Sequence, residues 1–306
     1  MPTEAKLKEQ VQNGKMIESR EEMTEGYEKA LKQILTVSGD TELMSAPAYY
    51  EQSLNAPSMD ARASCISVIQ DELGHGHIAY RLLEDLGEDR HDLIYEREPH
   101  EFRNTYGFDQ HIDNFAELVS AHGMFDRAGI VLLSDVHENT SYAPWKRALT
   151  KVNKEEQFHL RHGETWMRRL ANKSDKTRAK LQGAIDWMFP MAIEWFGLPD
   201  DKKKHDDQLE YCIKGKTNDE LREDWLERAM PLMNELDLDV PAHYDEAADE
   251  YVLDYEFPVA FDEDNKEWRF DEPISWDDVI DRWRGRGPAN EKYVDLIQSK
   301  TVEVQV

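Results

Sequence analysis

Cysteine is scarce in this chain of 306 residues, where only Cys65 and Cys212 occur. Two thiols cannot build a disulfide framework or a four-thiolate metal site, so we expect a protein of a reducing, cytoplasmic setting. Long apolar runs are also missing. None approaches the roughly 20 residues of a membrane-spanning helix, and the first residues show no apolar segment of a secretory signal. These absences predict a soluble protein.

Basic residues are in the minority, with 37 Lys and Arg against 64 Asp and Glu and a formal net charge of −27. Nucleic acids and anionic membrane surfaces attract a basic face, so we expect this protein to bind neither. A host with a salt-rich cytoplasm is a side hypothesis, which undiminished activity at low salt would contradict. Hydrophobic residues still make up 40% of the chain, which is enough for a sizeable core.

Helical patterns dominate the first two thirds of the sequence, with apolar or small residues recurring every three to four positions. Long helices are expected at about residues 20–46, 59–86, 112–136 and 144–172. The middle two are separated by a long connection at residues 88–110. Two helices, a long crossover and two more helices form one of the standard four-helix-bundle topologies, so the predicted class is all-α.

The character of the sequence changes again near residue 237. Before that point, further helices are expected at about residues 176–196, 207–213 and 219–236. Beyond it, acidic and aromatic pieces such as Tyr251–Phe257 and Trp268–Phe270 favour a small irregular or β-hairpin tail that packs on the bundle or on a partner. We therefore divide the chain into an N-terminal extension (1–19), a bundle with additional helices (20–236) and an acidic tail (237–306).

Two segments combine acids with a histidine at helical spacing. Glu72 precedes His75 by three positions, and Glu156 precedes His159 in the same way. On a helix, residues at i and i+3 share a face, so the two side chains of each motif can reach one metal ion. A single motif of this kind is common by chance, and the alternative is that its side chains simply lie on a solvent-exposed helix face.

The spacing of the two motifs changes that assessment. Glu72 and Glu156 are 84 residues apart, and each follows another acid by 30 residues, namely Glu42 and Asp126. The rival acid Asp40 faces nearly the opposite side of its helix. Two antiparallel helices joined by a short loop bring residues about 30 apart to the same level. The sequence thus resembles two copies of a helical hairpin, each supplying two carboxylates and one imidazole.

Four carboxylates and two histidines are the ligand set of a di-iron or di-manganese carboxylate site. Carboxylates bridge the two cations, and neutral imidazoles limit the total charge. Asp71 and Glu155 precede the two motif histidines by four positions and are expected to orient the imidazoles. The neighbouring His77 and His162 are interpreted as surface or core-edge histidines and His122 as a satisfied core histidine.

At these motifs the chain resembles the catalytic subunit of the multicomponent ring-1,2-phenylacetyl-CoA epoxidase, a family of di-iron oxygenases within the ferritin-like superfamily. The Glu-x-x-His pair alone identifies only the superfamily, whereas later motifs, especially TNDELR, indicate this family. The matching motifs are QDELGHG (70–76), TSYAP (140–144), KEEQFH (154–159), TNDELR (217–222) and Gly285-Arg286-Gly287 followed by Asn290-Glu291.

The resemblance implies a ferritin-like bundle that holds two iron ions as its catalytic centre. The implied ligands are Glu42, Glu72, His75, Asp126, Glu156 and His159. It further implies that one atom of O2 is inserted across the C1–C2 bond of the ring of phenylacetyl-CoA. Electrons come from NADPH through a reductase that carries FAD and an iron–sulfur cluster. This chain has no dinucleotide fingerprint and no cysteine cluster, so a reductase partner is required.

Coenzyme A is anionic, so an acidic protein that binds it needs a locally basic site. Lys214 and Lys216, together with Asn218, are the first candidates, and Lys146 and Arg147 the second. Ordinary surface lysines are an equal alternative for each.

Several other functions remain open for this sequence. The resemblance implies a hetero-oligomer with scaffold and small subunits, and the chain could itself be such a non-catalytic scaffold. It could also be a ferritin-like ferroxidase or storage protein, or the radical-generating part of a reductase. The scaffold lacks a full ligand set, and storage proteins are usually shorter. Whether the acyl-CoA carries a phenylacetyl or a related ring is not specified by the sequence.

Overall fold

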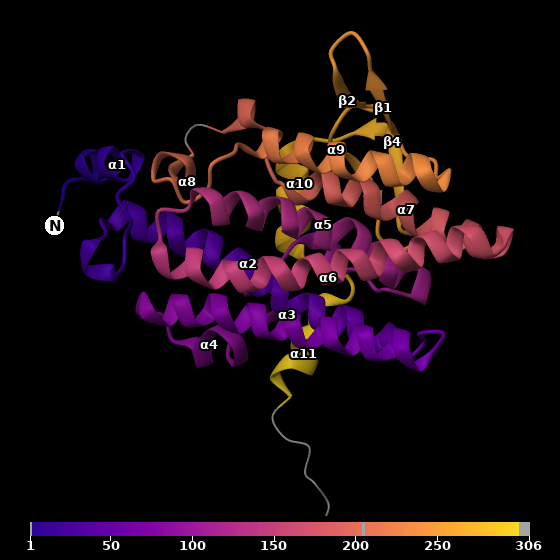
Figure 1. Ribbon diagram of the computed structural model, residues 1–306, viewed down its shortest axis with the longest axis horizontal. Coiled ribbons are helices and arrows are strands. Elements are labelled where there is room, and N and C mark those ends of the chain that lie inside the picture. Colours follow the sequence, from indigo (N-terminus) through magenta and orange to yellow (C-terminus); the bar gives the residue numbers. More distant parts are fainter. Residues whose placement is uncertain (1, 204–205, 300–306) are drawn as a thin grey trace, which may run out of the picture. The chain divides into compact units, whose positions relative to one another are not determined.

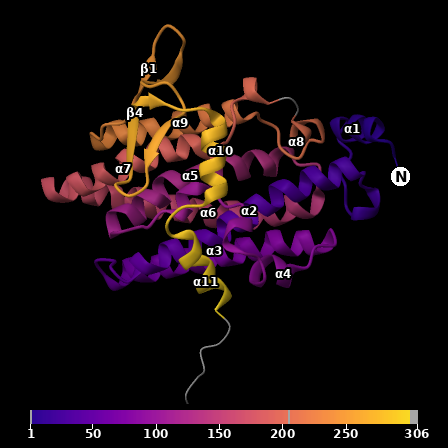
Figure 2. The same ribbon diagram turned by 180° about the vertical axis from the view of Figure 1, so that it is seen from behind.

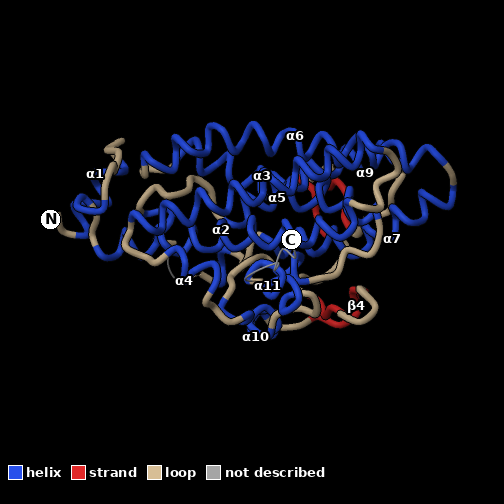
Figure 3. The backbone as a smooth tube through the Cα atoms, turned by 90° about the horizontal axis from the view of Figure 1, so that it is seen from below, coloured by secondary structure: helices blue, strands red, loops and turns tan. Residues whose placement is uncertain are grey.

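The computed structural model describes residues 2–203 and 206–299, so residues 300–306 of the expected tail lie outside the described part. The chain divides into two compact units, which comprise Met1–Leu31 with Asp113–Asp281 and Lys32–Ile112 with Arg282–Val306. Helices predominate, and the strands form two small two-stranded sheets near the C-terminus (Figure 3). The predicted all-α class with a small β-containing tail is confirmed. None of the helices in the described ranges combines the length and apolar character that crossing a membrane requires.

The second unit is built on an antiparallel helical hairpin. Its helices are α2 (Glu25–Ser53), which begins in the first unit, and α3 (Met59–Asp85). Ser58 ends the short loop between them and starts α3 by accepting a hydrogen bond from the backbone N–H of Ala61 at 3.1 Å. The long connection that follows contains α4 (Arg90–Tyr95) and the 3-10 turns η2 (Pro99–Glu101) and η3 (Tyr106–Asp109). Near the C-terminus, α11 (Asn290–Gln298) packs against α4 (Figure 2).

The expected bounds of the first long helix, 20–46, were wrong at both ends. Residues Arg20–Glu22 form the separate 3-10 turn η1, and α2 starts only at Glu25. There the carboxylate of Glu4 accepts the backbone N–H of Gly26 at 3.0 Å, a cap that comes from a distant segment and that local patterns do not show. At the other end, α2 continues through Pro47, because the following Ala48 and Tyr49 are fully buried and their packing compensates for the lost hydrogen bond.

The first unit contains the second antiparallel hairpin and its covering helices, which run side by side in Figure 1. The hairpin consists of α5 (Phe115–Asn139), capped by Asn114, and α6 (Ala143–Lys173). Helix α7 (Asp175–Trp195) packs on both, and α9 (Asn218–Leu236) packs on α5. The capping box between Thr217 and Glu220 starts α9 and accounts for part of the TNDELR motif. Before its strands, the unit also contains α1 (Glu4–Gln12), η4 (Asp200–Lys202) and α8 (Asp207–Glu210).

The tail contains the hairpins that the sequence predicts, together with two helices that it does not. Strands β1 (Ala242–Asp245) and β2 (Glu250–Leu253) pair antiparallel, as do β3 (Val259–Asp262) and β4 (Glu267–Pro273). The indole of Trp268 donates to the backbone oxygen of Trp187 at 2.9 Å and thereby fixes β4 to α7. Helices α10 (Trp276–Gly285) and α11 were not expected. The division into 1–19, 20–236 and 237–306 stays a prediction.

Candidate metal centre

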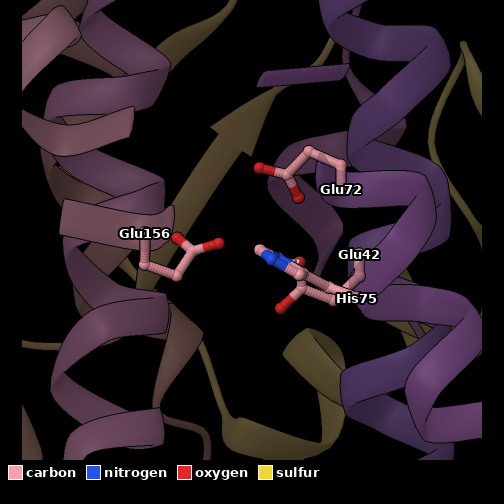
Figure 4. Close-up of side chains that lie close together, drawn as sticks. All are labelled: Glu42, Glu72, His75 and Glu156. Atoms are coloured by element: carbon pink, nitrogen blue, oxygen red, sulfur yellow. Dashed lines mark ion pairs between the residues drawn. The ribbon is translucent and has the colours of Figure 1, made fainter. Parts of the chain in front are cut away.

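The second unit places three of the expected ligands together. Glu42 lies on α2, and Glu72 and His75 lie one turn apart on α3. Each offers a ligand atom within 4.8 Å of the others, and His75 Nδ1 is 3.4 Å from Glu42 Oε2. Figure 4 shows these three side chains extending from the two helices toward one another. The side chains of His75 and Glu42 are only 2% and 13% exposed, so this carboxylate–imidazole set is largely shielded from water.

Two small residues hold α2 and α3 at the separation that this set needs. The hydroxyl of Ser45 lies 2.7 Å from both the Glu42 carbonyl oxygen and Glu72 Oε2, so it links α2 to a ligand on α3. A β-carbon added at Gly76 would lie 3.3 Å from both the carbonyl oxygen of Gly39 and the backbone nitrogen of Leu43 on α2, so the glycine lets the two helices approach closely. Ser45 was not among the residues expected at the site, and its one-turn spacing from Glu42 was the available signal.

The first unit places the other three expected ligands together. Asp126 lies on α5, and Glu156 and His159 lie one turn apart on α6, where Figure 4 shows the Glu156 side chain. Asp126 and His159 offer ligand atoms within 4.8 Å of each other, and His159 Nδ1 is 3.3 Å from Glu156 Oε1. All three side chains are buried. Each unit therefore holds two carboxylates and one imidazole, as the 84-residue repeat predicts.

The donor set in each unit fits a divalent metal ion. Carboxylates that are withdrawn from water are costly unless a cation or several donors compensate their charge. A cation held by carboxylate oxygens and imidazole nitrogens supplies that compensation, and iron or manganese accepts this mixture of ligands. The assignment of the six residues as metal ligands stays a prediction.

Close packing of α5 on α6 depends on Gly163. A β-carbon at this position would lie 2.7 Å from the β-carbon of His122 and 2.8 Å from the backbone nitrogen of Gly123. We therefore expect Gly163→Ala to lower the free energy of unfolding by about 1–3 kcal/mol, because the helices must move apart. Chemical denaturation measures this change. Gly183→Ala on α7 is the matched control, because no atom lies within 4 Å of its added carbon. An equal loss in both variants would contradict this account.

Two further histidines of the first unit form a pair. Nδ1 of His122 lies 3.2 Å from Nδ1 of His162, so one imidazole donates to the other. Burial lowers the pKa of His162 to about 4 and holds the pKa of His122 well below its usual value, so both are neutral near pH 7. His122 is thus a core histidine as expected, and His162 is buried with it. His77 is exposed.

The residues expected to orient the imidazoles are half-buried. The carboxylate of Glu155 is within 2.7 Å of the ammonium of Lys151 on the preceding turn, and Asp71 lies on α3 directly before Glu72. The roles of Asp71 and Glu155 stay a prediction.

The lysines proposed for coenzyme A have internal partners. Lys214 is buried, donates to Asn218 Oδ1 at 2.8 Å and lies 3.3 Å from Asp206; burial lowers its pKa. Lys216 is more exposed and donates to Asp224 at 2.5 Å, which raises its pKa. An anionic ligand at Lys214 or Lys216 must therefore compete with a carboxylate. Their role in binding coenzyme A stays a prediction.

The chain is similar to one known protein family and to two subunits of one enzyme. Residues 7–263 match the family described as phenylacetic acid catabolic protein. Two relatives are different subunits of the 1,2-phenylacetyl-CoA epoxidase of Escherichia coli (strain K12). The chain is 27% identical to the one designated A over 296 residues, which cover 96% of this chain and 91% of that relative. It is also 27% identical to the one designated C, but over 161 residues, which cover 52% of this chain and 64% of that relative.

Proposed function

Because this chain belongs to the phenylacetic acid catabolic protein family, we propose that it is the catalytic subunit of a di-iron monooxygenase that converts phenylacetyl-CoA to its ring 1,2-epoxide. The observation that carries this proposal is the duplicated donor set, with two carboxylates and one imidazole in each unit. The carboxylates and imidazoles of both sets are the proposed ligands of the enzyme's di-iron centre. A role in phenylacetate catabolism follows from the family itself.

The ligands of this centre are proposed to be Glu42, Glu72, His75, Asp126, Glu156 and His159. When bound, the two irons supply the activation of O2 for transfer of one oxygen atom to the aromatic ring. The polypeptide keeps bulk water away from the ligands, since all but Glu42 are buried. Ser45 fixes one oxygen of Glu72 and so limits how that carboxylate can turn. The ring substrate has to be positioned by the protein, because the metal chemistry itself does not select the C1–C2 bond.

The full ligand set favours a catalytic role over that of a scaffold. The similarity to the epoxidase component designated A extends over 96% of the chain, whereas the similarity to the component designated C covers 52%. We propose a complex with scaffold and small subunits in the cytoplasm. A separate reductase with FAD and an iron–sulfur cluster delivers electrons from NADPH, because the two cysteines of this chain are free thiols and cannot hold such a cluster.

Reconstitution tests this function directly. The iron-loaded chain is combined with the scaffold and small subunits, the reductase, NADPH and phenylacetyl-CoA under isotopically heavy O2. We expect mass spectrometry to find one heavy oxygen atom on the ring, with the second in water. Benzoyl-CoA serves as the comparison substrate and should react more slowly. Deposition of iron oxide without any oxygenated thioester would contradict the proposal and favour iron storage.

A further inference from the structure

The C-terminal motif Gly285-Arg286-Gly287 with Asn290 has no part in the proposed chemistry, yet it makes a dense set of contacts within the second unit. We call residues 286–290 the clamp segment and residues 102–110 the crossover loop. The clamp segment leads into α11 and ends at the first residue of that helix, Asn290. The crossover loop lies in the long connection after α3. The two segments are far apart in sequence and bind each other through one buried carboxylate.

That carboxylate belongs to Asp109, which is fully buried. It accepts hydrogen bonds from the side-chain amides of Asn104 and Asn290, both at 2.9 Å, and from the backbone N–H of Gly287 at 3.2 Å. Arg286 Nη2 lies 2.5 Å from the same group. Charge-assisted bonds to a buried carboxylate are among the strongest that a protein makes, so the clamp segment is firmly fixed to Asp109.

Backbone contacts extend this attachment along the crossover loop. The guanidinium of Arg286 donates to the carbonyl oxygens of Phe102 at 3.2 Å and Asn104 at 3.1 Å. At Gly287, an added β-carbon would lie 2.7 Å from the β-carbon of Asp109 and 2.9 Å from its carbonyl oxygen. The glycine is therefore required for the two segments to approach this closely.

The crossover loop is in turn bonded to the part of α2 that carries a predicted ligand. The backbone N–H of Arg103 donates to Asp40 Oδ2 at 2.7 Å, and that of Thr105 donates to Thr41 Oγ1 at 3.2 Å. Asp40 and Thr41 directly precede Glu42 in the sequence. Continuous contacts thus run from the clamp segment through the crossover loop to the turn of α2 that presents Glu42.

We propose that the clamp segment positions Glu42 for metal binding by holding the crossover loop against Asp40 and Thr41. This inference rests on the proposed metal centre. Of the three donors in the second unit, Glu42 is the one that is not buried, so neighbouring side chains enclose it less than they enclose Glu72 and His75. Its position depends correspondingly more on where its backbone is held.

Cobalt(II) titration of the full chain tests the inference, with the visible absorption of bound cobalt as the readout. Gly287→Ala and Arg286→Gln should each weaken cobalt binding by about 10–100-fold, the range usual for residues that orient metal ligands. Glu291→Gln is the matched control, because this neighbouring residue is exposed and its substitution should leave the affinity unchanged. Unfolding curves identify variants that remain folded, and Asn290→Ala replaces any that do not.

A double-mutant cycle separates positioning from general loosening. In the Glu42→Ala background, a clamp substitution that acts through Glu42 has nothing further to disturb, so Gly287→Ala should then change cobalt affinity by less than about twofold. The same loss with and without Glu42 would overturn the inference, and so would unchanged affinity in both clamp variants.

Amide hydrogen exchange of the metal-free chain distinguishes failure of the inference from failure of the proposed function. The N–H groups of Arg103 and Thr105 should exchange at least about tenfold faster in Arg286→Gln than in the parent, because their bonds to α2 open more often. Unchanged exchange would overturn the clamp even if cobalt binds. A parent chain that binds no cobalt would overturn the metal centre, and with it the role assigned to Glu42.

Discussion

Glu72→Gln should lower the rate of ring epoxidation by at least about a thousandfold, because it removes an anionic oxygen from the metal site and so costs several kcal/mol of stabilisation. Gln retains the size of Glu72 and its contact with Ser45 Oγ, so the fold is preserved. Turnover in the reconstituted complex is the measurement. Glu84→Gln changes a partly exposed carboxylate on the same helix that pairs with Arg81; it is the control and should retain the parental rate.

The same variant has a signature that does not depend on turnover. In the metal-free parent, Glu42 and Glu72 offer oxygens within 4.8 Å of each other, so their charges repel. Metal-free Glu72→Gln should therefore be at least as stable as the parent. Added iron(II) or cobalt(II) should stabilise the parent much more than the variant, because only the folded state binds the ion. Equal stabilisation of the two proteins would contradict the role of Glu72 as a ligand.

Arg97→Ala should destabilise the protein by about 3–5 kcal/mol, the loss expected when one partner of a buried ion pair is removed. Asp40 is fully buried and receives Arg97 Nη1 and Nη2 at 2.9 and 2.5 Å, with the hydroxyl of Tyr80 at 2.6 Å. Without the guanidinium, the carboxylate stays buried with only neutral donors. Chemical denaturation gives the change in unfolding free energy.

Two further variants make the result for Arg97 specific. Arg97→Lys should restore only part of the stability, because an ammonium cannot reproduce the two-pronged contact with Asp40. Arg81→Ala removes an exposed arginine that pairs with Glu84 on α3, and it should leave the unfolding free energy almost unchanged. A loss for Arg97→Ala no larger than that for Arg81→Ala would show that the pair contributes little.

The four long helices could be predicted because their signals are local. Each carries an apolar pattern, and the caps Ser58 and Asn114 mark the starts of α3 and α5. The start of α2 could not, because Glu4, which caps it, belongs to another helix. Helices α10 and α11 were missed for a related reason. They are short and lie in an acidic segment, and they are stabilised by burial of Trp276, Val279, Tyr293 and Val294, which becomes visible only in three dimensions.

The family and the grouping of candidate ligands followed from sequence motifs and their spacing. The motifs identified the phenylacetic acid catabolic family, which is confirmed by the match over residues 7–263. The 84-residue repeat singled out Glu42 and Asp126, and each lies beside the histidine of its own unit. Contacts between distant polar residues had no such signal. Neither the pairing of His122 with His162 nor the burial of Lys214 could be inferred, since both depend on how separate segments pack.

Iron analysis of the purified chain tests whether the six proposed ligands bind iron. The parent is compared with the Glu72→Ala, Glu156→Ala double variant, which removes one carboxylate from each unit. We expect about two irons per chain in the parent, as this ligand set implies, and none in the double variant. A well-folded parent without iron, or a double variant that retains the parental iron content, would contradict it.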